Sequence, residues 1–203
     1  MVEMRKKWIA VFCASMDGAR SEYLETARAM GRAIAERGYG VVYGGGNIGA
    51  MGAVAEGTLG ADGSIVGVIP DVIMDLEVGH IGLTELHVVR SMHERKALMA
   101  ERADAFVALA GGYGTLDEFI EIVTWAKLRI HGKPCVLVNT CGFYDPLLEF
   151  LDRCTSEGFL KQKDRNLVLV ARDADEALAI VEREWSARAE VPPHDTRLDE
   201  LVR

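Results

Sequence analysis

Residues 40–52 read GVVYGGGNIGAMG, and this stretch decides the fold. A short run rich in valine, typical of a strand, leads into three consecutive glycines and then into small residues that suit a helix. Glycine permits positive φ angles in such a turn and leaves backbone N–H groups open to a ligand. The same small residues also allow a helix to pack tightly on a strand, so this loop by itself favours neither explanation.

Residues 105–118 repeat the arrangement with the sequence AFVALAGGYGTLDE. An apolar strand again leads through glycines into a helix, and Thr115 adds a hydroxyl at the expected helix start. This hydroxyl can cap the helix or bind a phosphate oxygen, where the helix dipole favours an anion. Neither loop contains the GxxxxGK[ST] pattern. Two such loops at the carboxyl ends of parallel strands match the place where open α/β sheets bind ligands, and together they predict a phosphate site.

Outward from these loops, short apolar runs alternate with longer segments of helical period. Strands are expected at residues 8–13, 40–43, 64–69, 85–89, 105–109, 135–138 and 167–170. Helices are expected at residues 21–37, 48–59, 92–102, 115–130, 144–157 and 174–188, the first capped by Ser21 and stopped by Gly38. The pattern predicts an α/β fold: a Rossmann-like, doubly wound parallel sheet with helices on both faces.

Length and composition favour a single domain. The 203 residues are 49% apolar, which suffices for one continuous core. We expect one nucleotide-binding domain over residues 1–190 and a flexible C-terminal tail over residues 191–203, which carries two prolines and mixed charge without periodicity.

The charge balance excludes several classes of partner. A net charge of −8 gives no positive field to attract nucleic acid or an anionic membrane. No apolar stretch approaches the ~20 residues of a membrane span. The charged start and residues 8–15 superficially resemble a secretory signal, but the apolar run is short and has the length of a first strand. The four cysteines form no CxxC pair and are expected to be buried thiols in a reducing cytoplasm.

Charged residues near the second glycine loop suggest chemistry. Glu118 and Glu121 lie three residues apart, so both project from one face of the helix. With Asp117 they can simply complement the helix dipole, but a carboxylate one turn from a phosphate loop can also stabilise the oxocarbenium-like cation that forms when a base leaves ribose. Arg95 and Lys96, at the start of another helix, oppose its dipole unless an anion or a carboxylate neutralises them. His93 beside them is expected to be a capping or surface residue rather than a proton carrier.

Three segments together resemble the Lonely Guy family of cytokinin riboside 5′-monophosphate phosphoribohydrolases: residues 43–52, 92–96 and 111–118. The resemblance runs from about Val11 to Val138 and also covers residues 76–80 and 122–126. The family signature is PGGxGTxxE, and this chain has Ala110 at the proline position. Cys13-Ala14-Ser15 likewise departs from a more usual Cys-Gly-Ser.

The resemblance implies release of a free base and ribose 5-phosphate from a nucleoside 5′-monophosphate, without a metal or organic cofactor. It also implies a homodimer with helices of both subunits near each site. Arg95 and Glu118 take the catalytic positions. The substrate-contacting positions, with the first glycine loop included, are Glu77, Lys96, Gly111, Gly112, Tyr113, Gly114, Thr115, Glu121, Thr124, Gly45 and Gly46.

Several alternatives stay open at this point. Base selectivity between a cytokinin nucleotide and AMP is not determined by the sequence, so a broader purine nucleotide nucleosidase fits equally well. Related folds carry a molybdenum cofactor, whose pterin phosphate could use the same loops, but a carrier has no evident need for Arg95 with Glu118 and Glu121. The label of lysine decarboxylase, often given to such sequences, is not supported, because Lys96 beside Arg95 is not poised to form a Schiff base.

Overall fold

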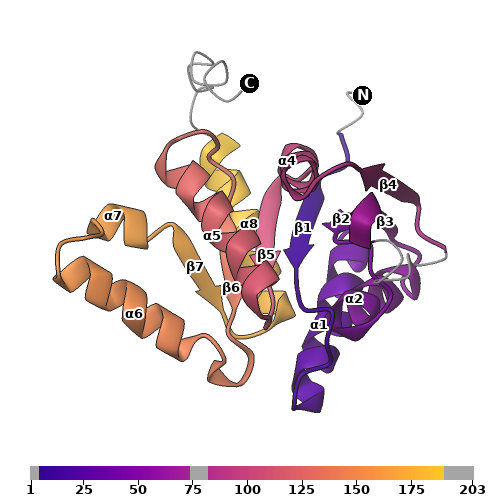
Figure 1. Ribbon diagram of the computed structural model, residues 1–203, viewed down its shortest axis with the longest axis horizontal. Helices are drawn as coiled ribbons and strands as arrows, with labels where there is room; N and C mark the ends of the chain where they lie inside the picture. The colour runs from indigo at the N-terminus through magenta and orange to yellow at the C-terminus, as the bar shows by residue number, and fades with distance from the viewer. Residues whose placement is uncertain (1–4, 74–81, 190–203) are drawn as a thin grey trace.

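The computed structural model describes residues 5–73 and 82–189, and in this part of the chain seven strands form one parallel sheet (Figure 1). Its strands are β1 (Trp8–Phe12), β2 (Gly40–Tyr43), β3 (Ser64–Pro70), β4 (Glu85–Val89), β5 (Ala105–Ala108), β6 (Cys135–Val138) and β7 (Val168–Ala171). The spatial order is β4-β3-β2-β1-β5-β6-β7, and all neighbouring pairs are parallel. The predicted Rossmann-like sheet is confirmed.

The described helices flank the sheet: α1 (Ser21–Glu36), α2 (Gly49–Leu59), α4 (Met92–Arg102), α5 (Tyr113–Lys127), α6 (Asp145–Ser156), α7 (Gln162–Arg165) and α8 (Ala174–Ala189). The six longer helices agree with the predicted ones to within three residues at each end. Helix α7 and the 3₁₀ turn η1 (Thr140–Gly142) were not predicted. Both are single turns, too short to display a helical period in the sequence.

Predicted helix caps are partly wrong. Ser21 is the first residue of α1 rather than its cap, since Arg20 holds the N-cap position and no side chain bonds there. Thr115 does not cap α5, which begins two residues earlier after Gly112. Gly38 ends α1 as expected, because its φ of +76° is a left-handed conformation that glycine adopts without a steric penalty.

Two apolar layers cover the sheet, one on each face. Alternate residues of a strand point to opposite faces, so Val11 of β1 belongs to one cluster and Ala10 to the other. The first cluster joins the sheet to α1, α2 and α8, and the second joins it to α4, α5 and partly buried residues of α6 (Figure 1). Burial on both faces explains why the central strands are apolar at every position.

Glycines hold α2 close to its neighbours. A Cβ at Gly57 would overlap the carbonyl of Arg28 in α1, so these two helices pack backbone to backbone. At its other end, Gly49 (φ +61°) lies against the backbone of Ser15, and the N–H of Met51 donates to the carbonyl of Ala14 over 3.1 Å. The first glycine stretch therefore fixes the loop that follows β1 on the start of α2.

The expectation of four buried cysteines is wrong. Cys13 and Cys135 are buried, but Cys141 is exposed and Cys154 is half-buried. No helix within residues 5–73 and 82–189 is long and apolar enough to cross a membrane. The predicted tail at residues 191–203 lies outside the described residues.

Candidate active site

A cavity of about 600 Å³ opens between the loop that follows β1 and the loop that follows β5. Strands β1 and β5 are neighbours, with Phe12 paired to Ala108 at their carboxyl ends. Strands β2, β3 and β4 follow β1 on one side of it, and strands β5, β6 and β7 lie on its other side. The strand order therefore reverses between β1 and β5, and the cavity lies at this topological switch point. Its volume lies within the usual range for small-molecule sites.

The start of α5 presents backbone donors to this cavity. The first backbone hydrogen bond that closes a turn of α5 runs from the N–H of Leu116 to the carbonyl of Gly112 over 3.0 Å. The preceding N–H groups of Tyr113, Gly114 and Thr115 belong to the first turn, where a helix has no intrahelical acceptors, and Gly112 offers no side-chain cap. A Cβ at Gly112 or Gly114 would meet no atom within 4 Å. This end of the helix is therefore open to an anionic ligand.

Gly111 and Thr115 form the tightest part of the loop. A Cβ at Gly111 would overlap the Thr115 hydroxyl, so only glycine leaves room for this side chain. Thr115 is 3% exposed and lines the cavity. Tyr113 also lines it, but its side chain is 95% exposed and lies at the rim. Four hydrogen-bonding groups thus lie together at the start of α5: the N–H groups of residues 113–115 and the Thr115 hydroxyl.

Arg95 of α4 and Glu118 of α5 meet in the same cavity. Each is 7% exposed, and Arg95 Nη2 lies 3.5 Å from Glu118 Oε1. This separation is longer than the 2.7–2.9 Å of a tight charge-assisted hydrogen bond. At this distance the two side chains still neutralise each other. Each can also form a hydrogen bond to a ligand that enters the cavity.

The guanidinium of Arg95 is held by packing more than by hydrogen bonds. A Cβ at Gly44 would overlap Arg95 Nη2, and Met92 Sδ lies 3.9 Å from Nη1. Nε is buried and has no hydrogen-bond partner among the described residues. The first glycine loop therefore contributes to the site through Gly44, which leaves space for the arginine.

Lys96 occupies a separate ionic cluster beside the cavity. Its Nζ lies 3.0 Å from Glu121 Oε2 and 3.1 Å from Asp117 Oδ2. Burial would lower the pKa of Lys96, but the hydrogen bonds to Glu121 and Asp117 outweigh this effect and raise it. The two cations at the start of α4 are neutralised by carboxylates of α5, which is one of the two solutions that the sequence predicted.

The structure brings only some of the predicted site residues together. Arg95, Glu118 and residues 111–115 line the cavity, whereas Lys96 and Glu121 lie beside it. Gly45 packs against Ile69 and Leu86, and Gly46 is buried at the end of the same loop; neither lines the cavity. Thr124 is exposed and its hydroxyl donates to the carbonyl of Ile120. Glu77 lies outside the described residues, and His93 is on the surface as expected.

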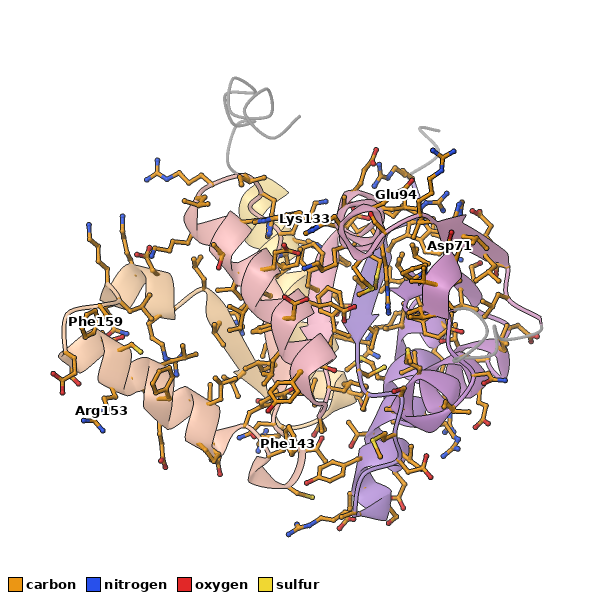
Figure 2. All side chains as sticks on the ribbon, viewed as in Figure 1. Asp71, Glu94, Lys133, Phe143, Arg153 and Phe159 are labelled. Atoms are coloured by element: carbon orange, nitrogen blue, oxygen red, sulfur yellow. The ribbon has the colours of Figure 1, made fainter. Side chains whose placement is uncertain are left out.

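Sequence reasoning missed one whole wall of the cavity. Residues 13–19, after β1, line it together with Tyr23 of α1 and Phe143, whose rings meet edge to face at 5.7 Å. Phe143 lies at the edge of the sheet where the strands end (Figure 2). The position of this loop directly after the first strand could have indicated a cavity wall. That conclusion requires knowing that β1 and β5 are neighbours, and the order of strands in the sheet cannot be predicted from the sequence.

Comparison with known proteins shows which family this chain resembles. The family described as "Possible lysine decarboxylase" matches residues 51–181. A cytokinin riboside 5′-monophosphate phosphoribohydrolase of Rhodococcoides fascians is 47% identical over 176 residues, which cover 86% of this chain and 89% of the relative. An enzyme of the same name from Oryza sativa subsp. japonica is 45% identical over 178 residues, covering 88% of this chain and 74% of the relative.

Similar folds occur among solved structures. The molybdenum cofactor (Moco) carrier protein of Chlamydomonas rheinhardtii superposes with a TM-score of 0.67 at 25% identity, over 90% of this chain and 99% of that protein. The identity to this carrier is well below that to the two phosphoribohydrolases.

Proposed function

This chain belongs to the family of cytokinin riboside 5′-monophosphate phosphoribohydrolases, and on that premise we propose that it hydrolyses the N-glycosidic bond of cytokinin riboside 5′-monophosphates and of AMP. The products are the free base and ribose 5-phosphate. The observation that carries the proposal is the buried Arg95–Glu118 pair at the open start of α5, within one cavity.

In the proposed mechanism the nucleotide phosphate binds the N–H groups of residues 113–115 and the Thr115 hydroxyl. Arg95 neutralises the remaining negative charge or contacts the region of the bond that breaks. The ribose then extends along α5 towards Glu118. Glu121, one turn further, was expected to hold it as well, but it lies beside the cavity and is paired with Lys96. These assignments rest on the helix geometry, since an anion at the start of α5 places its substituent beside the first turns of the same helix.

Glu118 supplies the chemistry of the bond cleavage. The bond between the ribose C1′ and the base nitrogen breaks, its electron pair leaves with the base, and positive charge develops on the ribose ring. The Glu118 carboxylate stabilises this cation and orients a water molecule, whose oxygen bonds to C1′. One proton of that water replaces the ribose on the base, so the reaction consumes one water and needs no other reactant.

Product analysis by chromatography tests the proposed function. Purified protein is incubated separately with isopentenyladenosine 5′-monophosphate, AMP and adenosine. We expect free base and ribose 5-phosphate from both nucleotides, and at least ~100-fold slower release from adenosine, because the nucleoside lacks several charge-assisted hydrogen bonds. The ratio of the two nucleotide rates measures base selectivity.

Two outcomes would contradict this function. Equal rates of base release from adenosine and AMP would mean that the start of α5 does not bind the phosphate. No release from either nucleotide, while a known nucleosidase is active in the same assay, would favour a binding protein. Recovery of a bound pterin from anaerobically purified protein would then point to a carrier of the kind found among the similar folds.

We also propose a homodimer in which helices of both subunits lie near each site. Apolar side chains remain exposed on the outer elements of the chain, among them Leu128 after α5, Phe150 on α6 and Phe159 before α7. Phe159 and Arg153 lie on the α6–α7 edge of the fold (Figure 2). A second copy that covers such residues accounts for their exposure in a single chain.

Sedimentation velocity at micromolar concentration tests the assembly. We expect a single species of twice the chain mass of 22.2 kDa. A monomer that retains full activity at the same concentration would count against a shared site. As for compartment, we propose the cytoplasm, because Cys13 and Cys135 carry thiols that are buried in the core, which suits a reducing environment.

A further inference from the structure

The base of the second glycine loop is tied to a distant tyrosine. The hydroxyl of Tyr144 donates a hydrogen bond of 2.6 Å to the carbonyl of Leu109. Leu109 immediately follows β5, so one residue, Ala110, separates this bond from the first glycine of the loop. A bond at this carbonyl fixes the peptide plane from which residues 110–112 continue.

Tyr144 is itself held rigidly. Its side chain is 2% exposed within the apolar cluster between the sheet and α5, and its ring meets Phe143 edge to face at 4.9 Å. Asn139, at the end of β6, accepts a hydrogen bond from the Tyr144 N–H over 2.7 Å and donates to Asp145 over 2.6 Å. Burial raises the pKa of the Tyr144 phenol far above its usual value, so the hydroxyl stays protonated and can donate.

The turn before Tyr144 is conformationally demanding. Cys141 adopts a φ of +55°, which is unfavourable for a residue other than glycine, and Gly142 follows with a φ of +70°. A Cβ at Gly142 would crowd the Asp145 carboxylate. The unfavourable conformation of Cys141 therefore belongs to the turn that places Tyr144 against the carboxyl end of β5.

Ala110, next to Leu109, is the residue on which the Tyr144–Leu109 hydrogen bond can have an effect. A proline at this position, as in the PGGxGTxxE signature, would fix the φ of residue 110 through its ring. Alanine restricts that torsion less than proline does, so a restraint from outside the loop has more effect here. The Tyr144 hydroxyl provides one from outside the loop, and it does so next to the residue that lacks the ring.

We propose that Tyr144 is a positioning residue that holds the glycine loop in its phosphate-binding geometry through the Leu109 carbonyl. The inference rests on the proposed function, because it assigns the phosphate to this loop. Tyr144 does not line the cavity and acts only through the backbone.

Tyr144→Phe tests the role, since it removes the hydroxyl and retains the ring. We expect the Kd for ribose 5-phosphate, measured by calorimetry, and the KM for AMP each to rise about 10-fold, the scale of one buried hydrogen bond. The turnover number is expected to change less than 3-fold, because Glu118 and Arg95 stay in place. A merely structural role would lower the melting temperature without moving Kd.

Tyr39→Phe is the matched control. The Tyr39 hydroxyl bonds to Glu182 over 3.1 Å, and its ring packs on Trp185, in the layer of α1 and α8 away from the cavity. This variant should leave the Kd unchanged. If Tyr144→Phe binds ribose 5-phosphate as tightly as wild type, or if Tyr39→Phe weakens binding equally, the positioning role is wrong.

A rescue variant separates loop geometry from general damage. Ala110→Pro in the Tyr144→Phe background should recover at least 3-fold of the lost affinity, since the ring restrains the torsion that the hydroxyl no longer controls. A double variant no better than Tyr144→Phe alone would overturn the explanation. If Tyr144→Phe does not fold, Asn139→Ala, which releases the Tyr144 backbone, is expected to raise Kd about 3-fold, and an unchanged Kd there would also overturn it.

Failure of the proposed function looks different. If wild-type protein neither binds ribose 5-phosphate nor releases base from any nucleotide, the site assignment itself is wrong. If wild type does both and Tyr144→Phe matches it, only the role of Tyr144 fails.

Discussion

Replacement of Glu118 by glutamine is expected to lower the turnover number for AMP about 10²- to 10⁴-fold, the usual scale for one acid/base or charge-stabilising group. Glutamine keeps the size and most of the shape of the side chain but removes the negative charge. The cation that develops on the ribose then loses the carboxylate that stabilises it. Steady-state kinetics give the turnover number, and KM is expected to change less than 10-fold because phosphate contacts are retained.

Asp117→Asn provides the control for this experiment. Asp117 precedes Glu118 on the same helix and forms an ion pair with Lys96 outside the cavity. Its loss should alter activity less than 5-fold, since the side chain is more than half exposed and such pairs contribute little. Near-normal turnover of Glu118→Gln would mean that Glu118 serves only to neutralise Arg95.

Replacement of Arg95 by methionine is expected to reduce kcat/KM for AMP about 10²- to 10³-fold. The guanidinium is buried beside Glu118, where a fixed positive charge acts in a poorly solvated site and is worth more than in water. Methionine fills a similar volume without the charge. The variant also leaves Glu118 without its arginine, so a lower melting temperature is expected alongside the kinetic loss.

Two further variants separate these effects. Arg102→Met removes another arginine of α4, one that pairs with Glu85 over 3.0 Å away from the cavity, and it should retain near-normal kcat/KM. Gly44→Ala keeps the Arg95 charge but introduces a Cβ that overlaps Nη2, so it should displace the guanidinium and lower kcat/KM as well. Normal activity of both Arg95→Met and Gly44→Ala would exclude Arg95 from the reaction.

Local sequence patterns were sufficient to predict the strands and the long helices. Each strand and each long helix is marked by its own period of apolar residues, and glycines mark the turns between them. The short helix α7 and the turn η1 escaped prediction because a single turn has no period. The cap at Ser21 was wrong, and of the two roles left open for Thr115 the structure does not show the cap, because the exact first residue of a helix depends on where the preceding loop packs.

The site was predicted in part. Glu118 and residues 111–115 were identified by the glycine-loop motif and Arg95 by its place at a cationic helix start, and the structure places all of them on one cavity. Residues 16–19 and Phe143 were missed, since no motif marks them as cavity residues, and Cys13-Ala14-Ser15 was noted only as a departure from the family pattern. The sequence left the role of the first glycine loop open between ligand binding and tight packing. In the structure Gly49 supports the loop after β1 and Gly44 makes room for Arg95.

The sequence by itself determined the parallel α/β class, the order of its elements along the chain, the helix start that carries Arg95 and the glycine-loop motif that carries Glu118. Each of these properties depends on residues close to one another in the chain. Only the tertiary structure decided that β1 and β5 are neighbours, that the loop after β1 forms the facing wall, and that Tyr144 reaches the Leu109 carbonyl. Contacts between residues 35 to 100 positions apart depend on how the strands are ordered and how the helices pack, which no local period encodes.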